Sequence, residues 1–271
     1  MASVVDVRHR IERRPGRGLE LSVHVFEPDI GAFGEWTVLL LHGFLDAGGT
    51  WDLVAQRLVA EGHRVIAPDQ RGFGRSDRVG PGGYYHFYDY VADIDALVGS
   101  FDPERRLAVV GHSMGGAVAS MFAGARPDRV ERLVVCEGLG PPSMEPAVAV
   151  QRTRRWLDQL EQGKPSKPLK NRADALKRLA AFHGKVEYHV LESRVEHLAD
   201  FDEGGGGRWR YDPLHRTSSP QRFDRDAFLS FVKAVHCPVM FVSGGPSGFH
   251  PEDESIRLAA FSQPVKVVEL A

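Results

Sequence analysis

A short apolar run, a serine set among glycines and a helical pattern follow one another between residues 107 and 126. The run is Leu-Ala-Val-Val, the turn is Gly-His-Ser-Met-Gly-Gly at 111–116, and small apolar residues follow Ser113 at helical spacing. A strand that passes directly into a helix needs a sharp turn, and glycines beside that turn let neighbouring backbone approach without a Cβ clash. The pattern predicts a strand at 107–111, a helix at 114–126 and an exposed serine hydroxyl between them.

The same strand–helix order recurs on both sides of this segment. Apolar runs predict strands at 19–26, 37–41, 64–67, 132–136, 238–242 and 265–270, and helical spacing predicts helices at 50–61, 88–101, 225–235 and 252–261. A continuous apolar run such as 37–41 is typical of a strand covered on both faces. The alternation predicts an α/β fold, with a mostly parallel sheet flanked by helices.

Between residues 141 and 223 the alternation stops. Helical patterns at 147–162, 172–183 and 186–200 are separated by polar, irregular sequence, and the glycines at 204–207 indicate a flexible loop. The simplest organisation is a core made of residues 1–140 and 224–271, interrupted by a helical lid at 141–223. A chain of 271 residues is long enough for such a core with an added subdomain.

Net charge and the distribution of apolar residues limit the kinds of partner expected for this chain. The formal net charge of −2 creates no general attraction for nucleic acid or an anionic membrane, and no apolar run approaches the roughly 20 residues that span a bilayer. The first 18 residues lack the apolar region of a secretory signal, so we expect a cytoplasmic protein that acts on a small molecule. Cys136 and Cys237 lie in or beside apolar runs and are interpreted as buried free thiols. The sequence has no clustered metal ligands and no P-loop lysine, so no metal or organic cofactor is expected.

Ser113 belongs to a pattern with known chemistry. A G-x-S-x-G between a strand and a helix is the nucleophile-elbow motif, and N–H groups at the helix start favour developing negative charge. Three further motifs accompany it, namely HGF at 42–44, DQRGFGRSD at 69–77 and EGLGPP at 137–142. Together these motifs resemble the α/β-hydrolase superfamily, in the branch with an HG-x oxyanion motif and a lid. The resemblance runs from about residue 19 to the last residue.

The resemblance implies a serine hydrolase with Ser113 as its nucleophile. The backbone N–H groups of Phe44 and Met114 would form the oxyanion hole, where each donor contributes about 3 kcal/mol to the tetrahedral intermediate. By the same resemblance, His42 and His112 hold the oxyanion loop and the elbow, and the residues at 69–77 fix the loop after their strand.

The resemblance also implies an acidic residue that orients a catalytic histidine, and here this sequence departs from the family pattern. Its usual position falls near Ser247, and no carboxylate lies between Ser243 and His250. The fold has a second position for the acid, at the end of the strand after the nucleophile helix, where this chain has Glu137. A carboxylate at the C-terminal end of a parallel strand points toward the active-site rim, where it can orient an imidazole. The alternative role for Glu137 is to anchor the hinge of the lid.

The resemblance also implies a catalytic histidine, which it assigns to the loop after the last core strand and hence beyond Ala271. Two alternatives remain open: His215 or His250 substitutes for it, or the chain is a catalytically inactive ligand-binding homologue. Acyl-enzyme hydrolysis of a carboxylic ester of a small hydrophobic substrate is the preferred function, with C–C bond or amide and peptide hydrolysis as alternatives. Epoxide hydrolases and haloalkane dehalogenases attack with an aspartate where this chain has Ser113, so their chemistry is disfavoured.

Aromatic residues of the predicted lid are candidates for contact with the substrate. Trp156, Trp209 and Tyr211 are the three that we select. Aromatic side chains in a small helical cap serve equally well as its own packing, and this alternative stays open.

Overall fold

The structure is a computed structural model that describes residues 6–29, 34–101, 104–163 and 166–270. The predictions that concern the first five residues and the chain from Ala271 onward lie outside these ranges. None of the described helices combines the length and apolar character needed to cross a bilayer.

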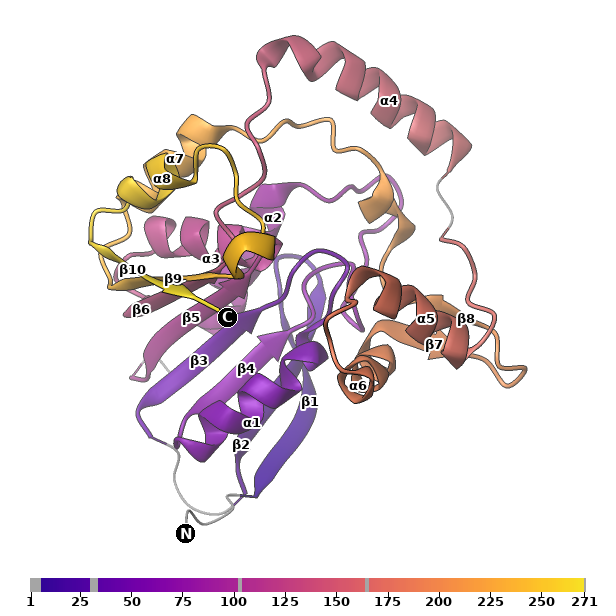
Figure 1. Cartoon of the computed structure of the whole chain (residues 1–271), viewed down its shortest axis with the longest axis horizontal. Coiled ribbons are helices and arrows are strands. Elements are labelled where there is room, and N and C mark those ends of the chain that lie inside the picture. The colour runs from indigo at the N-terminus through magenta and orange to yellow at the C-terminus, as the bar shows by residue number, and fades with distance from the viewer. Residues whose placement is uncertain (1–5, 30–33, 102–103, 164–165, 271) are drawn as a thin grey trace.

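The centre of the molecule is a sheet in the order β1-β2-β4-β3-β5-β6-β9-β10 (Figure 1). Its strands are β1 (Val7–Pro15), β2 (Glu20–Pro28), β3 (Trp36–Leu41), β4 (Arg64–Pro68), β5 (Arg106–His112), β6 (Arg132–Cys136), β9 (Val239–Ser243) and β10 (Val265–Glu269). The β1–β2 and β2–β4 pairs are antiparallel, and every pair from β4 to β10 is parallel. The carboxyl ends of these parallel strands therefore lie along one edge of the sheet, where an active site is expected in this type of fold.

Helices cover both faces of the sheet. They are α1 (Asp52–Ala60), α2 (Phe87–Gly99), α3 (Met114–Ala125), α7 (Arg225–Lys233) and α8 (Glu254–Ala259). Side chains alternate between the two faces of a strand, so Val38 and Leu40 of β3 pack with α1, whereas Leu39 and Leu41 join the larger core beneath α2, α3 and α7. This arrangement confirms the predicted α/β fold, and the predicted core elements agree with the observed bounds to within two residues.

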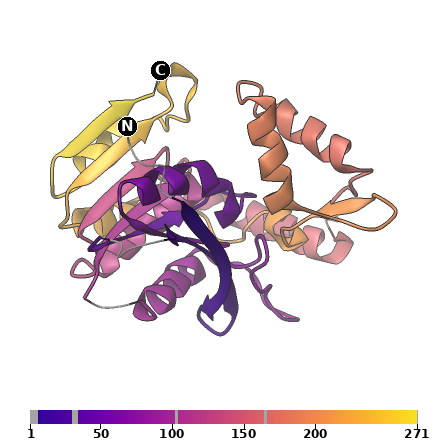
Figure 2. The same ribbon diagram turned by 90° about the horizontal axis from the view of Figure 1, so that it is seen from below.

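Residues 141–223, here called the insertion, lie between β6 and α7 and extend to one side of the sheet (Figure 2). They contain α4 (Ala149–Gln162), α5 (Arg172–Phe182), α6 (Tyr188–Leu198), β7 (Ala199–Phe201), β8 (Gly207–Trp209) and a short helix η3 (Pro213–Arg216). A small separate core of Leu169, Ala175, Leu176, Leu191 and Val195 holds α5 against α6.

The glycine stretch at 204–207 is more ordered than predicted. It closes an antiparallel hairpin in which β7 pairs with β8. The Asp202 carboxylate accepts a hydrogen bond from the Gly206 N–H at 3.0 Å. This local contact, together with the strand pairing, stabilises a turn where the composition indicated only flexibility.

Candidate active site

Ser113 joins the end of β5 to the start of α3 with an uncommon backbone conformation. Its φ is 51° and its ψ is −117°, a region that non-glycine residues rarely adopt and that is found at functional turns. Its N–H donates to the carbonyl of Cys136 at 2.9 Å, which ties the turn to β6. A Cβ on Gly115 would lie 2.3 Å from the carbonyl oxygen of Leu41, so this close approach of α3 to β3 requires glycine.

The N–H groups of Phe44 and Met114 have no acceptor within the described residues. Met114 is the first residue of α3, where the backbone N–H has no intrahelical partner. Both residues line one cavity with Ser113, and we call it the Ser113 cavity. It has a volume of about 360 Å³ and is lined by Phe44, Phe87, Ser113, Met114, Ala117, Glu137, Gly140, Pro141 and Phe249. Two free donors beside a serine are the elements of an oxyanion site.

His42 supports the loop that carries Phe44. It is buried, its Nδ1 lies 2.7 Å from the Gly43 carbonyl oxygen, and its Nε2 accepts the Gln70 N–H at 2.9 Å. Burial lowers its pKa, which favours the neutral ring. Because both ring nitrogens are occupied, His42 is not available as a base for Ser113.

Glu137 follows β6 directly and also has a positive φ, of 50°. Its Oε1 accepts hydrogen bonds from the N–H groups of Gly244 at 2.8 Å and Phe249 at 3.1 Å. These donors belong to the loop after β9, the loop in which the usual acid position near Ser247 contains no carboxylate. The Glu137 carboxylate thus reaches that loop from the neighbouring strand, and it lines the Ser113 cavity.

Glycines make room for this carboxylate. A Cβ on Gly248 would lie 1.9 Å from Glu137 Oε1, and one on Gly244 would lie 2.8 Å from it. The same loop meets the end of β10, where the Leu270 N–H donates to the Ser243 carbonyl at 2.8 Å. The end of β10 and the Glu137 side chain therefore both contact the loop that follows β9.

The other candidate histidines are engaged elsewhere. His215 is buried, stacks on Phe73 with a centroid separation of 3.9 Å, and has its Nδ1 3.3 Å from the hydroxyl of Tyr90. His250 has its Nδ1 2.9 Å from Glu254 and its Nε2 2.8 Å from the Gly245 carbonyl oxygen. Neither residue lines the Ser113 cavity within the described part of the chain.

The three aromatic residues predicted to contact substrate lie outside the described lining of the Ser113 cavity. The Trp156 ring meets Tyr84 at 5.4 Å, and Trp209 packs on the small core of the insertion. The Tyr211 hydroxyl lies 2.9 Å from the Ser166 hydroxyl. The aromatic residues that do line the cavity are Phe44, Phe87 and Phe249, of which only Phe44 carried a sequence motif that marked it.

The 69–77 loop stabilises the core beside the site. Arg71 makes two hydrogen bonds to the buried Asp93, at 2.5 and 2.7 Å. The Ser76 hydroxyl accepts the Ser22 N–H at 2.8 Å, and Asp77 accepts the Glu20 N–H at 2.9 Å. These contacts agree with the positional role that the resemblance implied for this motif.

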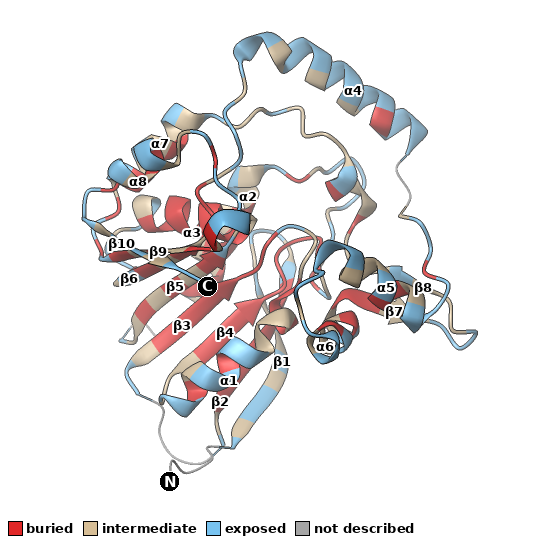
Figure 3. Cartoon of the chain, in the orientation of Figure 1, coloured by how far each residue is buried: buried red, intermediate tan, exposed pale blue. Residues whose placement is uncertain are grey.

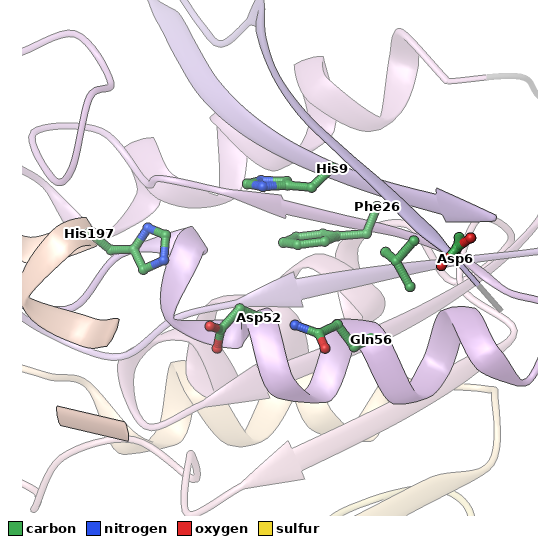
Figure 4. Close-up of a pocket in the computed structure, with 7 residues that line it drawn as sticks. Asp6, His9, Phe26, Asp52, Gln56 and His197 are labelled. Atoms are coloured by element: carbon green, nitrogen blue, oxygen red, sulfur yellow. The ribbon is translucent and has the colours of Figure 1, made fainter. Parts of the chain in front are cut away.

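A different cavity of about 460 Å³ opens between β1, α1 and α6 (Figure 4). Its lining includes His9, Asp52 and His197, but it contains neither serine nor cysteine among the described residues. Across the part of the chain that the structure describes, no group of three histidine, cysteine, aspartate or glutamate side chains is arranged to hold a metal ion. The Ser113 cavity brings together the strained Ser113, the residues of two free N–H donors and the Glu137 carboxylate, and we therefore take it as the candidate active site.

Comparison with known proteins agrees with this geometry. Residues 37–264 match the family model described as the alpha/beta hydrolase fold. The chain belongs to the α/β-hydrolase family. The mostly parallel sheet flanked by helices is the α/β-hydrolase fold that the sequence resembled.

Similar proteins include a member of the AB hydrolase superfamily and an epoxide hydrolase. The AB hydrolase superfamily protein YfhM of Bacillus subtilis is 40% identical over 120 residues, which are 44% of this chain and 41% of the relative. Epoxide hydrolase B of Mycobacterium tuberculosis is 38% identical over 97 residues, which are 36% of this chain and 27% of the relative. The chain thus spans less than half the length of each of these two relatives.

Among solved structures, the thioesterase domain from the curacin biosynthetic pathway has a TM-score of 0.82 and 26% identity, and the alignment covers 97% of this chain and 93% of that domain. An esterase from Mycobacterium tuberculosis has a TM-score of 0.67 and 23% identity, with 97% and 83% covered. The esterase supports the fold alone. The α/β hydrolase described here therefore has both esterases and epoxide hydrolases among the proteins it resembles.

Proposed function

We propose that this α/β hydrolase acts through an acyl-enzyme on Ser113, and that its substrate is a carboxylic ester of a small hydrophobic molecule. One observation carries the proposal: Ser113, Glu137 and the residues of both free N–H donors line a single cavity. The same cavity has apolar walls from Phe87, Ala117 and Pro141, which favour a hydrophobic substrate.

In the proposed reaction the Ser113 oxygen attacks the ester carbonyl while a histidine takes its proton. Glu137 orients that histidine and stabilises it when protonated. The N–H groups of Phe44 and Met114 hold the negative oxygen of the intermediate, and the C–O bond of the ester breaks as the histidine returns its proton to the leaving alcohol. Water, deprotonated by the same histidine, then releases the acid from Ser113. The resemblance assigns the histidine to the residues after β10, a strand that ends beside the loop holding Glu137.

We further propose that the insertion acts as the lid of the Ser113 cavity. Its Lys185 ammonium lies 3.2 Å from the Ser247 hydroxyl, in the loop that surrounds Glu137. Its Arg194 pairs with Asp46 at 3.0 Å, close to the oxyanion loop. The insertion therefore contacts both sides of the site. Substrate contact by Trp156, Trp209 and Tyr211 stays a prediction, and the packing of Trp209 favours a structural role.

Epoxide hydrolysis is the alternative that the relative from Mycobacterium tuberculosis raises. The presence of a serine at the elbow favours acyl transfer, since a serine ester is a normal intermediate of acyl transfer. Hydrolysis of a thioester, as the name of the curacin domain describes for that protein, would use the same intermediate on Ser113.

A fluorophosphonate probe tests the proposal on the full-length protein. We expect one covalent adduct by intact mass, together with hydrolysis of 4-nitrophenyl butyrate. Ser113→Ala should abolish both, whereas Ser255→Ala, on the exposed face of α8, should retain both. An adduct that survives Ser113→Ala would contradict the proposal. Tight ligand binding without any adduct would instead support an inactive binding protein.

A further inference from the structure

A second cavity adjoins the Ser113 cavity, and we call it the distal cavity. It has a volume of about 220 Å³ and shares Phe87 and Pro141 with the Ser113 cavity. Its walls include the apolar side chains Met121, Phe223 and Phe228, which come from α3 and from the region around the start of α7. A substrate that reaches past Phe87 would bury an apolar segment there, at about 25 cal/mol for each Å² removed from water.

Two arginines and one carboxylate also line the distal cavity. Arg222 donates to the Met144 carbonyl at 3.3 Å and lies 3.8 Å from the Asp224 carboxylate, so its charge has a neighbouring counter-charge. The Asp224 carboxylate additionally accepts the Ala227 N–H at 3.1 Å, which caps α7. The two arginines and the one carboxylate give the lining of the distal cavity a formal charge of +1.

Arg152 carries the positive charge that has no neighbouring counter-charge in the described lining of this cavity. Its Nη2 donates to the Ser219 carbonyl at 2.8 Å, but its Nε is buried without a hydrogen-bond partner. No carboxylate lies within ion-pair distance of Arg152 among the described residues. A half-buried guanidinium beside apolar walls, with an unused donor, favours an anionic ligand, because guanidinium binds carboxylate through two parallel hydrogen bonds.

Neighbouring contacts determine which way Arg152 faces. Gln159 accepts the Ser218 N–H at 2.6 Å, and the Trp156 ring meets Tyr84. Residues 152, 156 and 159 lie on one face of α4, so these contacts turn Arg152 toward the same side. Arg154, two residues along, lies on the opposite face of the helix and is exposed. It provides a matched control of the same charge on the same helix.

We infer that the distal cavity binds the far end of the substrate and that Arg152 selects substrates whose far end is a carboxylate. The inference rests on the proposed hydrolysis at Ser113. The substrate class is then a half-ester of a dicarboxylic acid or an equivalent ester, with an apolar spacer between the carbonyl that Ser113 attacks and a terminal carboxylate.

Two fluorophosphonates of equal chain length test this selectivity, one ending in a carboxylate and the other in its methyl ester. The carboxylate probe should label the wild-type protein about tenfold faster, equivalent to about 1.4 kcal/mol. Arg152→Gln should reduce the ratio of the two rates to about one, Arg152→Lys should retain part of it, and Arg154→Gln should leave it unchanged. A wild-type ratio near one, or a preference that survives Arg152→Gln, overturns the inference.

Binding to the Ser113→Ala variant separates this inference from the proposed chemistry. Calorimetry would compare monomethyl suberate with dimethyl suberate. A preference for the charged ester that Arg152→Gln removes supports the anion site even if neither fluorophosphonate labels Ser113, a result that would reject only the acyl-enzyme proposal. Equal binding of the two esters overturns the anion site, whatever the labelling shows.

Discussion

At the scale of single residues, the proposed role of Glu137 depends on the negative charge of its carboxylate. Glu137→Gln keeps the oxygen that accepts from Gly244 and Phe249, so the fold should be retained. In the proposed reaction it removes the negative charge that would orient and stabilise a protonated histidine. We expect kcat to fall by up to about 10⁴-fold with little change in KM. Steady-state ester hydrolysis measures this, and Glu252→Gln, at an exposed position, is the control. A purely structural Glu137 would leave kcat near the wild-type value.

Gly248 is a second residue whose role follows from one distance. Its φ of −74° suits any residue, but an added methyl group would meet Glu137 Oε1 at 1.9 Å. Gly248→Ala should therefore displace the carboxylate and lower kcat, whereas Gly184→Ala, which meets nothing closer than 3.8 Å, should not. Comparison of kcat with the free energy of unfolding for both variants checks this. Loss of stability without loss of kcat would argue against displacement of Glu137.

At the scale of elements, α3 and α4 differ most in how they are held. Most of α3 is buried, including every residue from Gly115 to Ala123, whereas Gln159 is the single buried residue of α4 (Figure 3). Val150, Leu157 and Leu160 of α4 are exposed apolar side chains. Helices in proteins derive most of their stability from tertiary packing, so α4 should open locally far more often than α3.

Hydrogen–deuterium exchange followed by mass spectrometry measures this difference. We expect the amides of α4 to exchange about 100-fold or more faster than those of α3, equivalent to about 3 kcal/mol of local stability. Peptides from α5 and α6, which share a small core, should lie between them. Equal protection of α3 and α4 would show that α4 is held by contacts beyond those described here.

Within the central sheet, β1 is the strand that sequence patterns missed. Four of its nine residues are arginines, and more than half of the nine are exposed because β1 is an edge strand. Edge strands carry charged residues that discourage pairing with other molecules, so they lack the apolar run by which buried strands are found. Pairing with β2 over its whole length forms the strand, a contact that local patterns do not encode.

At the scale of the whole molecule, two buried histidines couple folding to pH. Burial lowers the pKa of His24 to about 3, with a further contribution from nearby His9 and His197, and burial lowers the pKa of His215 to about 3. In the unfolded chain these two histidines take up protons as the pH falls through about 6.5, whereas in the folded protein both stay neutral at that pH. Their stabilising contribution is therefore complete above pH 6.5 and falls as the pH decreases below it, by about 1 kcal/mol per pH unit for each histidine.

Urea unfolding at pH 7.5 and pH 5 checks this dependence. His215→Phe preserves the aromatic stack with Phe73 and removes the titrating group, so the loss of stability on acidification should become smaller. His189→Phe alters a mainly exposed histidine and should leave the pH dependence unchanged. A His215→Phe protein with the wild-type pH dependence would contradict the assignment of this effect to His215.

Local sequence patterns alone determined the α/β core and the position of Ser113, because strand and helix periods and the glycines of a tight turn act within a few residues. They also marked Phe44, which follows a strand in a recognisable motif. Tertiary structure alone decided that the Glu137 carboxylate is held by Gly244 and Phe249, more than 100 residues away, and that Arg152 faces a cavity shared with the site. Such contacts depend on how distant segments pack, and many different sequences between them would satisfy the same local patterns.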